Sequence, residues 1–449
     1  MKRKPTNEQF QKQLDQMVQT LRDEIEQGVY RPGQYLPSEH HLSKRFGMSN
    51  NSVRKGLDIL VREGRIEKIP RVGNKVCIQR APVTLTLACN ESDWLNLELE
   101  NLLNDFHRCY PWITINAKPI NFYMLGKNTE LIESFDLFMI TNTHPLDLPW
   151  LLHPLEINPD IYPFLTNQFI RDGRLYAQPI IFSPVVLCYN KQHFRESGIP
   201  EPDGSWTWND LMQNAAKLTN GKGRYGFCFY LQNLNRWPIF LLQSGEKFEW
   251  IEGRLAEFRG SKLFSGIRLC KEIIHNRDVF PLYLSENNQE INRMFMEGKI
   301  SMTLNTYLGL NEWKHADLEY DISPIPFIDQ PITLAMVQGI GINRKTPHLE
   351  EAKQLVHYMT SEQCQNFIRK NTLSLPTLQS LHSTSVERNV TLPSRYSLYR
   401  EMMFSYKMHS DMNIPRKDFS KLFTHLKAYW ANLIDEEETC RQIYKDLSN

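Results

Sequence analysis

Residues 37–76 read PSEHHLSKRFGMSNNSVRKGLDILVREGRIEKIPRVGNKV, and this stretch predicts two helices and a short hairpin, in that order. Ser38 can cap the first helix, and Gly47 can end it because glycine accepts the left-handed C-cap conformation. Ser49 can cap a second helix over residues 49–62. The turn between the two helices is therefore only a few residues long.

The second helix is expected to have one apolar and one polar face. Val53, Leu57 and Leu60 recur at i, i+4 and i+7, which is the spacing of the buried side of an amphipathic helix. Two short strands should follow, over 65–69 and 75–78, because apolar and polar residues alternate there.

An upstream helix completes this segment. Apolar residues over 10–25 have helical spacing, and Gly28 follows them. With a hairpin turn at Val72 and Gly73, residues 1–79 have the order of a winged helix-turn-helix, which is mostly α-helical with a small β wing. Such a module places its second turn helix in the major groove of DNA.

The polar face of this segment supplies candidate DNA contacts. Short polar and basic side chains can reach base edges and phosphates from a helix or a wing. The candidates are Ser38, Glu39, His40, Arg45, Ser49, Asn50, Asn51, Ser52, Arg54, Arg71, Gly73 and Lys75.

Charge is unevenly distributed along the chain. Residues 1–80 carry 16 Lys and Arg against 9 Asp and Glu, whereas the remainder carries 36 against 42. A basic head on a mildly acidic body favours nucleic-acid binding through one end of the chain.

Residues 6–78 resemble the DNA-binding domain of the GntR family of bacterial transcription regulators. The resemblance implies operator DNA as a partner and, because such modules bind paired half-sites, a homodimer. Three positions depart from it. His40 and Asn50 stand where the family often has arginine, and Gly56 replaces a usual alanine at a helix cost near ~1 kcal/mol. The operator sequence therefore does not follow from the resemblance. The matching residues are Gly28, Pro32, Gly33, Leu36, Pro37, Ser38, Glu39, Leu42, Phe46, Gly47, Ser49, Val53, Arg54, Leu57, Leu60, Glu63, Gly64 and Gly73.

Composition narrows the class of protein. No run of about 18 apolar residues is present, so no membrane span is expected. The first residues have no apolar segment after their charges, so no signal peptide is expected. The eight cysteines are scattered without a C-x-x-C pair, which favours a reducing cytoplasm over a disulfide framework or a metal site.

After a short joint at residues 79–82, the pattern changes to alternating strands and helices. Strands are predicted over 83–89, 113–120 and 135–140, and a helix over 95–110. The strand at 135–140 is wholly apolar, as in a buried parallel sheet. This alternation is typical of an α/β domain.

Several later segments occur in an order that resembles the sugar-binding (family 1) solute-binding proteins of ABC importers. The resemblance implies a two-lobed α/β domain of the periplasmic-binding-protein-like type 2 over 83–449, with a solute in the cleft. It suggests a first lobe of 83–184 and 285–335 and a second lobe of 185–284 and 336–449. The segments are 175–179, 185–191, 205–211, 237–238, 295–303 and 339–343.

The resemblance also implies cleft residues. Aromatic faces stack on sugar rings, and Asp, Asn, Glu and Arg side chains bind sugar hydroxyls. Ser183 stands where importers often have an acidic residue. For four tryptophans, packing in the core is a better explanation than ligand contact; these are Trp206, Trp208, Trp237 and Trp430. The candidate ligand residues are Asn90, Glu91, Asp93, Trp94, Thr141, Asn142, Phe182, Ser183, Asn235, Arg236, Trp237, Asn305 and Tyr307.

Three functions compete on these patterns. The favoured one is a one-component regulator whose clamp senses a small molecule, with a carbohydrate as the expected ligand. The second is a regulator whose clamp only dimerises. The third is a fusion to an enzyme-like domain that holds pyridoxal phosphate, but no lysine motif or complete phosphate loop supports it. We identify no nucleophile–base pair, so no catalytic residue, cofactor or metal is expected.

Overall fold

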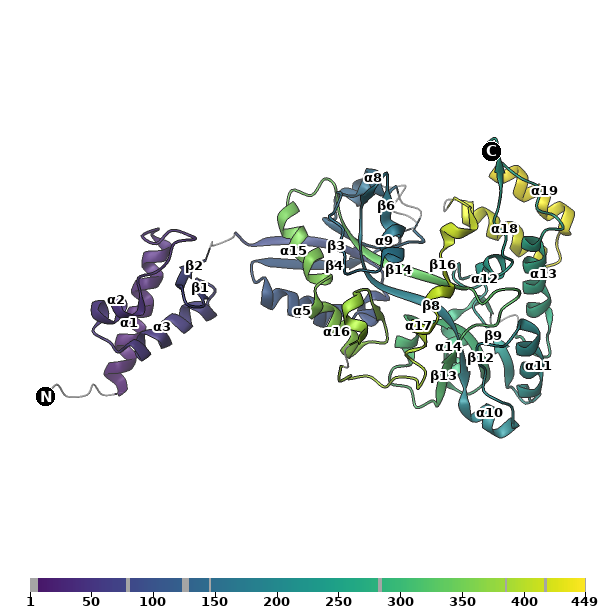
Figure 1. Ribbon diagram of the computed structural model, residues 1–449, viewed down its shortest axis with the longest axis horizontal. Coiled ribbons are helices and arrows are strands. Elements are labelled where there is room, and N and C mark those ends of the chain that lie inside the picture. Colours follow the sequence, from purple (N-terminus) through teal and green to yellow (C-terminus); the bar gives the residue numbers. More distant parts are fainter. Residues whose placement is uncertain are drawn as a thin grey trace. The chain divides into compact units, whose positions relative to one another are not determined.

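A computed structural model describes residues 7–77, 81–122, 129–144, 147–281, 285–383, 386–415 and 418–448. The chain divides into two compact units, Met1–Pro82 and Val83–Asn449 (Figure 1). No helix among these residues is long and apolar enough to cross a membrane.

The N-terminal unit has three helices and a hairpin. They are α1 (Asn7–Glu26), α2 (Glu39–Phe46), α3 (Asn50–Arg62), β1 (Ile66–Ile69) and β2 (Gly73–Val76). The strands pair antiparallel, with Ile66 opposite Val76 and Ile69 opposite Gly73. The fold predicted for this segment is confirmed, but the hairpin turn differs. Arg71, with φ 64°, lies in the turn, and Gly73 belongs to the second strand.

The apolar faces of the three helices form one core. Val53, Leu57 and Leu60 of α3 are all buried, together with apolar residues of α1 and both strands. Gly56 lies on the same buried face. A Cβ atom there would come within 2.0 Å of the Met17 terminal methyl carbon. Close packing of α1 on α3 therefore accounts for a glycine in this helix.

The C-terminal unit alternates helices and strands around one large sheet. Its first half contains β3 (Val83–Cys89), α4 (Asp93–Asn96), α5 (Leu99–Cys109), β4 (Ile113–Pro119), α7 (Thr129–Glu133), β5 (Leu137–Thr141), α8 (Leu148–Leu151), α9 (Pro163–Thr166), β6 (Ile170–Arg171), β7 (Arg174–Leu175), β8 (Gln178–Asn190), α10 (Lys191–Ser197), α11 (Trp208–Leu218), β9 (Tyr225–Cys228) and α12 (Pro238–Leu242). The second half contains β10 (Trp250–Ile251), β11 (Arg254–Leu255), α13 (Lys262–His275), α14 (Asn288–Met296), β12 (Ile300–Thr306), β13 (Tyr320–Ser323), β14 (Thr333–Ile342), α15 (Leu349–Met359), α16 (Glu362–Asn371), β15 (Leu375–Pro376), α17 (Leu398–Glu401), β16 (Tyr406–Lys407), α18 (Phe419–Trp430) and α19 (Glu436–Leu447).

The predicted early strands are present and pair in parallel. β3 pairs with β4 along its whole length and with β5 at Leu87 and Ala88. The predicted helix over 95–110 is instead two helices, α4 and α5. Glu98 separates them because its backbone adopts a positive φ of 51°.

The long strand β8 belongs to both lobes (Figure 1). Its first part pairs with β14, with Gln178 opposite Ile340 and Pro184 opposite Ala335. Its second part pairs with β12 and β13, beginning with Val185 opposite Thr306. The sheet order is β4-β3-β5-β14-β8-β12-β9, so β8 joins the sheets of the two lobes.

This pairing corrects two of the predicted lobe segments. β12 and β13, in the predicted first-lobe segment 285–335, pair with the second-lobe part of β8. β14 pairs with β5 of the first lobe, although most of it falls in the predicted second-lobe segment 336–449. α18 and α19 contact α13 of the second lobe, since Trp430 Nε1 donates to the Ile267 carbonyl and Arg268 Nε donates to Glu436 Oε1 at 2.8 Å. Pairing between strands far apart in sequence leaves no mark in the local pattern.

Candidate functional site

Side-chain caps position the two turn helices. The Ser38 hydroxyl accepts the backbone N–H of His41 at 3.3 Å, and the Ser49 hydroxyl accepts that of Ser52 at 3.2 Å. Gly47 ends α2 at φ 64°. These caps start α3 at Asn50, so the polar first turn predicted to contact DNA is exposed at the helix end.

Arg54 of α3 is held by α2. Its Nε donates to Glu39 Oε2 at 2.6 Å, and the terminal nitrogen atoms of its guanidinium make no hydrogen bond within the described part of the chain. Those two nitrogen atoms are therefore available for the paired acceptors of a guanine edge or for a phosphate.

The other predicted cations differ in how free they are. Arg45 pairs with Glu24 of α1, and its guanidinium carbon lies 5.0 Å from the Phe46 ring centroid. Lys75 Nζ is 3.6 Å from Glu67 Oε1. Arg71, in contrast, is exposed at the hairpin turn. Arg54 and Arg71 are thus the predicted arginines best placed to face DNA.

The predicted first-lobe ligand residues gather where β3 and β5 end. Asn90 follows β3 and Asn142 follows β5, and the carboxyl ends of neighbouring parallel strands form the usual ligand edge of such a sheet. Asp93 is 1% exposed and accepts bonds from the Asn90 N–H at 2.8 Å and from Gln338 Nε2 at 2.9 Å. Its burial raises the pKa of the Asp93 carboxyl to about 6.

Two side chains of this edge are presented outward. Trp94 is 37% exposed, and Glu91 is exposed. The Asn142 side chain is buried instead, since its Oδ1 accepts the Val337 N–H at 3.0 Å. Thr141 shares a hydroxyl contact of 2.7 Å with Thr143. Trp94 and Glu91 are therefore the most exposed of the predicted ligand residues at this edge, and Asn90 and Thr141 are partly exposed.

The predicted second-lobe residues gather where β9 and β12 end, because these two strands are also parallel. Arg236 is 3% exposed; its Nε donates to the Leu304 carbonyl at 3.0 Å, and Nη2 donates to Asn305 Oδ1 at 3.3 Å. Asn305 is 4% exposed. The structure thus brings the Arg236 and Asn305 side chains into direct contact.

A segment that sequence reasoning missed bridges the two edges. Asn142 Nδ2 of the first lobe contacts Met408 Sδ at 3.6 Å. The ring of the next residue, His409, lies 2.7 Å from the Leu234 carbonyl of the second lobe. Residues 408–409 follow β16 and lie far along the chain from both edges, so no local signal marks them.

Four further predicted ligand residues are buried by protein, like Asp93, Asn142, Arg236 and Asn305. Ser183 accepts the Leu308 N–H at 2.9 Å, and Tyr307 donates to the Tyr396 carbonyl at 2.9 Å. Phe182 packs edge-on against Tyr399, and Trp237 stacks on Phe423. None of the four side chains faces solvent, so in this conformation they support the site rather than line it.

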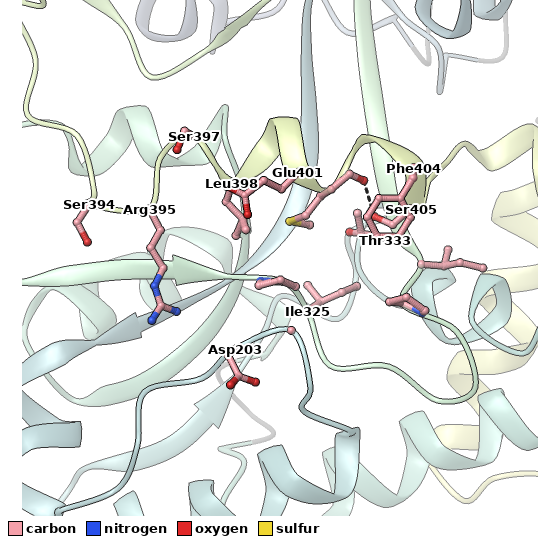
Figure 2. A pocket seen from close by; sticks show the side chains of 15 residues that line it. Asp203, Ile325, Thr333, Ser394, Arg395, Ser397, Leu398, Glu401, Phe404 and Ser405 are labelled. Carbon is pink, nitrogen blue, oxygen red and sulfur yellow. Dashed lines mark hydrogen bonds between the residues drawn. The ribbon is translucent and has the colours of Figure 1, made fainter.

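Residues from segments 203–204, 324–333 and 394–405 line an open pocket of about 600 Å³, and no predicted ligand residue is among them (Figure 2). Asp203, Ile325, Thr333, Arg395 and Phe404 are among its lining residues. In Figure 2, Arg395 reaches from the upper segment, and Asp203 lies on the opposite side. Arg395 is already bonded to the Pro202 carbonyl at 2.6 Å.

All eight cysteines are free thiols. Across the described ranges, no group of three or more His, Cys, Asp or Glu is arranged to hold a metal ion.

Two protein families match parts of this chain. The family of bacterial extracellular solute-binding proteins matches residues 130–393, and the gntR family of bacterial regulatory proteins matches residues 13–76.

The chain belongs to the bacterial extracellular solute-binding protein family. Its N-terminal unit is a GntR-type winged helix-turn-helix, so a regulator domain is fused here to a solute-binding domain. Both matched families are regulator or solute-binding types and not enzyme families.

Individual relatives agree with this division. A Brucella abortus protein provisionally named as a binding protein is 25% identical over 178 residues, which are 37% of this chain and 41% of that protein. The uncharacterized HTH-type transcriptional regulator YieP of Escherichia coli is 36% identical over 63 residues, 14% of this chain and 27% of that regulator. The chain therefore matches less than half the length of each of these two relatives.

A solved structure confirms the fold of the solute-binding unit. An ABC substrate-binding protein of Listeria monocytogenes, in complex with cycloalternan, aligns with a TM-score of 0.70 at 18% identity. The alignment covers 82% of this chain and 98% of that one. At this identity the likeness shows the two-lobed fold.

Proposed function

We propose that this protein is a cytoplasmic one-component transcription regulator that binds operator DNA and responds to a small carbohydrate-like solute. The observation that carries the proposal is the fusion of a GntR-type winged helix to a solute-binding unit whose two lobe edges each present polar residues. A solute-binding unit joined to a DNA-binding unit gives a direct route from solute concentration to DNA occupancy.

The DNA end of the proposal rests on α3 and the hairpin. Arg54 and Arg71 supply cations, and Asn50 and Asn51 supply short amides at the start of the helix. Because helix-turn-helix modules usually bind paired half-sites, the working form should be a homodimer.

The solute end rests on the lobe edges. Trp94 offers an exposed aromatic face for a sugar ring, and Glu91 lies beside it along the chain. Solute binding should close the lobes on each other and change how the dimer holds its two winged helices, with a coupling of about 1–3 kcal/mol.

A two-step experiment tests the proposal on the full-length protein. A panel of mono- and oligosaccharides is first screened by thermal unfolding. The best ligand is then added to a gel-shift titration of double-stranded DNA enriched from a random library by the same protein.

The expected result is a raised melting temperature and at least a fivefold change in DNA affinity. Trp94→Ala should weaken the saccharide shift, whereas Trp150→Ala, an exposed tryptophan of α8, should leave it unchanged. If a saccharide binds but DNA affinity does not change, the proposal that the protein responds to a solute is refuted. The solute-binding unit would then serve as a dimerisation module.

A further inference from the structure

Buried polar atoms without hydrogen-bond partners concentrate at the second-lobe edge. Within the described residues they include Arg236 Nη1, Asn305 Nδ2, Asn235 Oδ1 and Trp237 Nε1. Buried polar groups in folded proteins are almost always hydrogen-bonded, so each exception calls for a missing partner such as a bound group or water. Two of these atoms, Arg236 Nη1 and Asn305 Nδ2, belong to side chains that are hydrogen-bonded to each other, so one missing acceptor can serve both.

Arg236 and Asn305 direct the same kind of group toward that partner. The unused atoms are an Nη1 of a guanidinium and an Nδ2 of an amide, which are both hydrogen-bond donors. The two side chains are already bonded to each other through Nη2 and Oδ1. Two adjacent donors require an acceptor, and oxygen atoms of a solute are the available acceptors in a carbohydrate site.

The charge of Arg236 is not balanced locally. The structure's described residues place no carboxylate oxygen within 4 Å of its nitrogen atoms, whereas the surface arginines of this lobe, such as Arg224 and Arg268, have one. Glu312 is the acidic group whose charge acts on Arg236, but its own Oε2 is bonded to Asn292 Nδ2. Burial lowers the pKa of Arg236 to about 10, which leaves the guanidinium protonated at neutral pH.

A neutral side chain would satisfy the structural role of Arg236. Thr303 is the last residue of β12 that pairs with β9, so the Leu304 carbonyl lies beyond the β9 pairing, and it accepts a bond from Arg236 Nε. An uncharged donor could make that bond without the cost of burying a charge. A buried cation is expected where an anion joins it.

Resting on the proposed function, we propose that the solute carries an anionic oxygen group, a phosphate or a carboxylate, which Arg236 and Asn305 bind at the second-lobe edge. The sugar or polyol part then extends toward the first-lobe edge, where Trp94 and Glu91 lie. The ligand class is a small acidic carbohydrate.

Matched pairs of probes test this class by isothermal titration at one ionic strength. The pairs are glucose with glucose 6-phosphate, glucose with glucuronate, and maltose with maltobionate, and inorganic phosphate is measured alone. The phosphate and carboxylate arms distinguish the two anionic groups. Bonds to a charged group contribute about 10- to 100-fold in affinity, so at least one charged member should bind tenfold tighter than its neutral partner.

Substitutions locate the effect. Arg236→Met should abolish the preference for the charged member over the neutral member, and Arg236→Lys should retain part of that preference. Arg224→Met is the control, because Arg224 also bonds a backbone carbonyl in this lobe but pairs with Glu196. If Arg236→Met does not fold, Asn305→Ala serves in its place and should reduce the preference.

The outcomes separate this inference from the proposed function. If neutral saccharides bind as tightly as their charged partners, the proposal of an anionic ligand is wrong. The proposal that the protein is a solute-responsive regulator would still stand. A preference that survives both Arg236→Met and Asn305→Ala would overturn the assigned site. Failure of every probe and every saccharide to bind would overturn both proposals.

Discussion

Arg54, which we propose contacts DNA, is already held by Glu39 in the free protein. The hydrogen bond from Arg54 Nε to Glu39 restricts the conformations of the Arg54 guanidinium. Less side-chain entropy is therefore lost when its terminal nitrogen atoms bind an acceptor. Arg71 is placed differently, because the backbone turn of the wing presents it. The two arginines should therefore contribute separately to DNA binding.

We expect Arg54→Ala and Arg71→Ala each to weaken DNA binding and to lower the slope of log affinity against log salt by about 1, because each removes one cation. Gel-shift titrations at several salt concentrations measure both effects. Arg441→Ala, which removes an exposed arginine of α19, is the control. A slope equal to that of the unmodified protein would remove the substituted arginine from the DNA interface.

Asp93 makes stability depend on pH. Its pKa in the folded protein, about 6, is above the ordinary value of 3.8, so the folded state binds the proton more tightly than the unfolded state. Its contribution to stability therefore rises as pH falls from about 6 to about 4 and is lost as pH rises through 6. The full effect is on the order of 3 kcal/mol.

Urea unfolding should give a higher free energy of unfolding at pH 4.5 than at pH 7.0. Asp93→Asn should remove the part of this difference that comes from Asp93. The exposed Asp172→Asn is the control and should leave the pH dependence unchanged. Equal pH dependence of the unmodified protein and Asp93→Asn would show that Asp93 does not titrate in this range.

At the scale of elements, α12 is positioned by a close approach to α13. A Cβ atom on Gly266 of α13 would lie 2.3 Å from the Phe240 carbonyl oxygen of α12. Since α12 begins directly after Arg236 and Trp237, this packing also sets the backbone of the second-lobe edge.

Gly266→Ala should destabilise the solute-binding unit by about 1–3 kcal/mol, because a backbone oxygen has little room to retreat. It should also weaken solute binding through displacement of α12. Ser265→Ala, on the exposed side of the same helix, should change stability by less than about 0.5 kcal/mol. Chemical denaturation compares the two variants, and equal stability would contradict the close packing.

The helices that are marked by residues close in sequence were predictable, whereas the strands that pair with β8 could not be read from its own residues. Caps at Ser38 and Ser49 and the spacing of Val53, Leu57 and Leu60 mark helices through neighbours in sequence. In contrast, all thirteen residues of β8 are buried, and the run itself does not identify its partner strands. The change of lobe between Pro184 and Val185 was expected only from the resemblance to solute-binding proteins.

The residues of the candidate site show the same distinction between local sequence signals and tertiary packing. The positions of Asn90, Asn142 and Asn305 at strand ends follow from strand boundaries, and these were predicted. Tyr307 also follows a strand end, whereas Phe182 and Ser183 lie inside β8. The burial of all three depends on Tyr396, Tyr399 and Leu308, which come from other parts of the chain. Exposure of a strand-end residue is thus decided by tertiary packing.

At the scale of the whole molecule, each unit has its own core. One apolar cluster lies within residues 14–76, and the two others lie within residues 85–447. No cluster combines residues of both units within the described parts of the chain. Each unit should therefore unfold as a separate cooperative transition.

Differential scanning calorimetry should show two unfolding transitions, one for each unit. A bound solute should raise the midpoint temperature only of the larger transition, which belongs to the solute-binding unit. At one hundred times its Kd, a solute adds about 2.7 kcal/mol to the unit that binds it. A variant lacking solute affinity should show no shift in either. Two transitions that move together would show that solute binding also stabilises the winged helix.

The shared strand β8 has a consequence for how such a protein can be divided. The first lobe needs residues 83–184 and β14, and the second needs residues that come between them, so the two lobes are interleaved along the gene. Neither lobe can be obtained as one uninterrupted fragment, and a deletion of β8 removes a strand from both halves of the sheet. The winged helix, which occupies one continuous segment, is the part that a gene rearrangement can exchange intact.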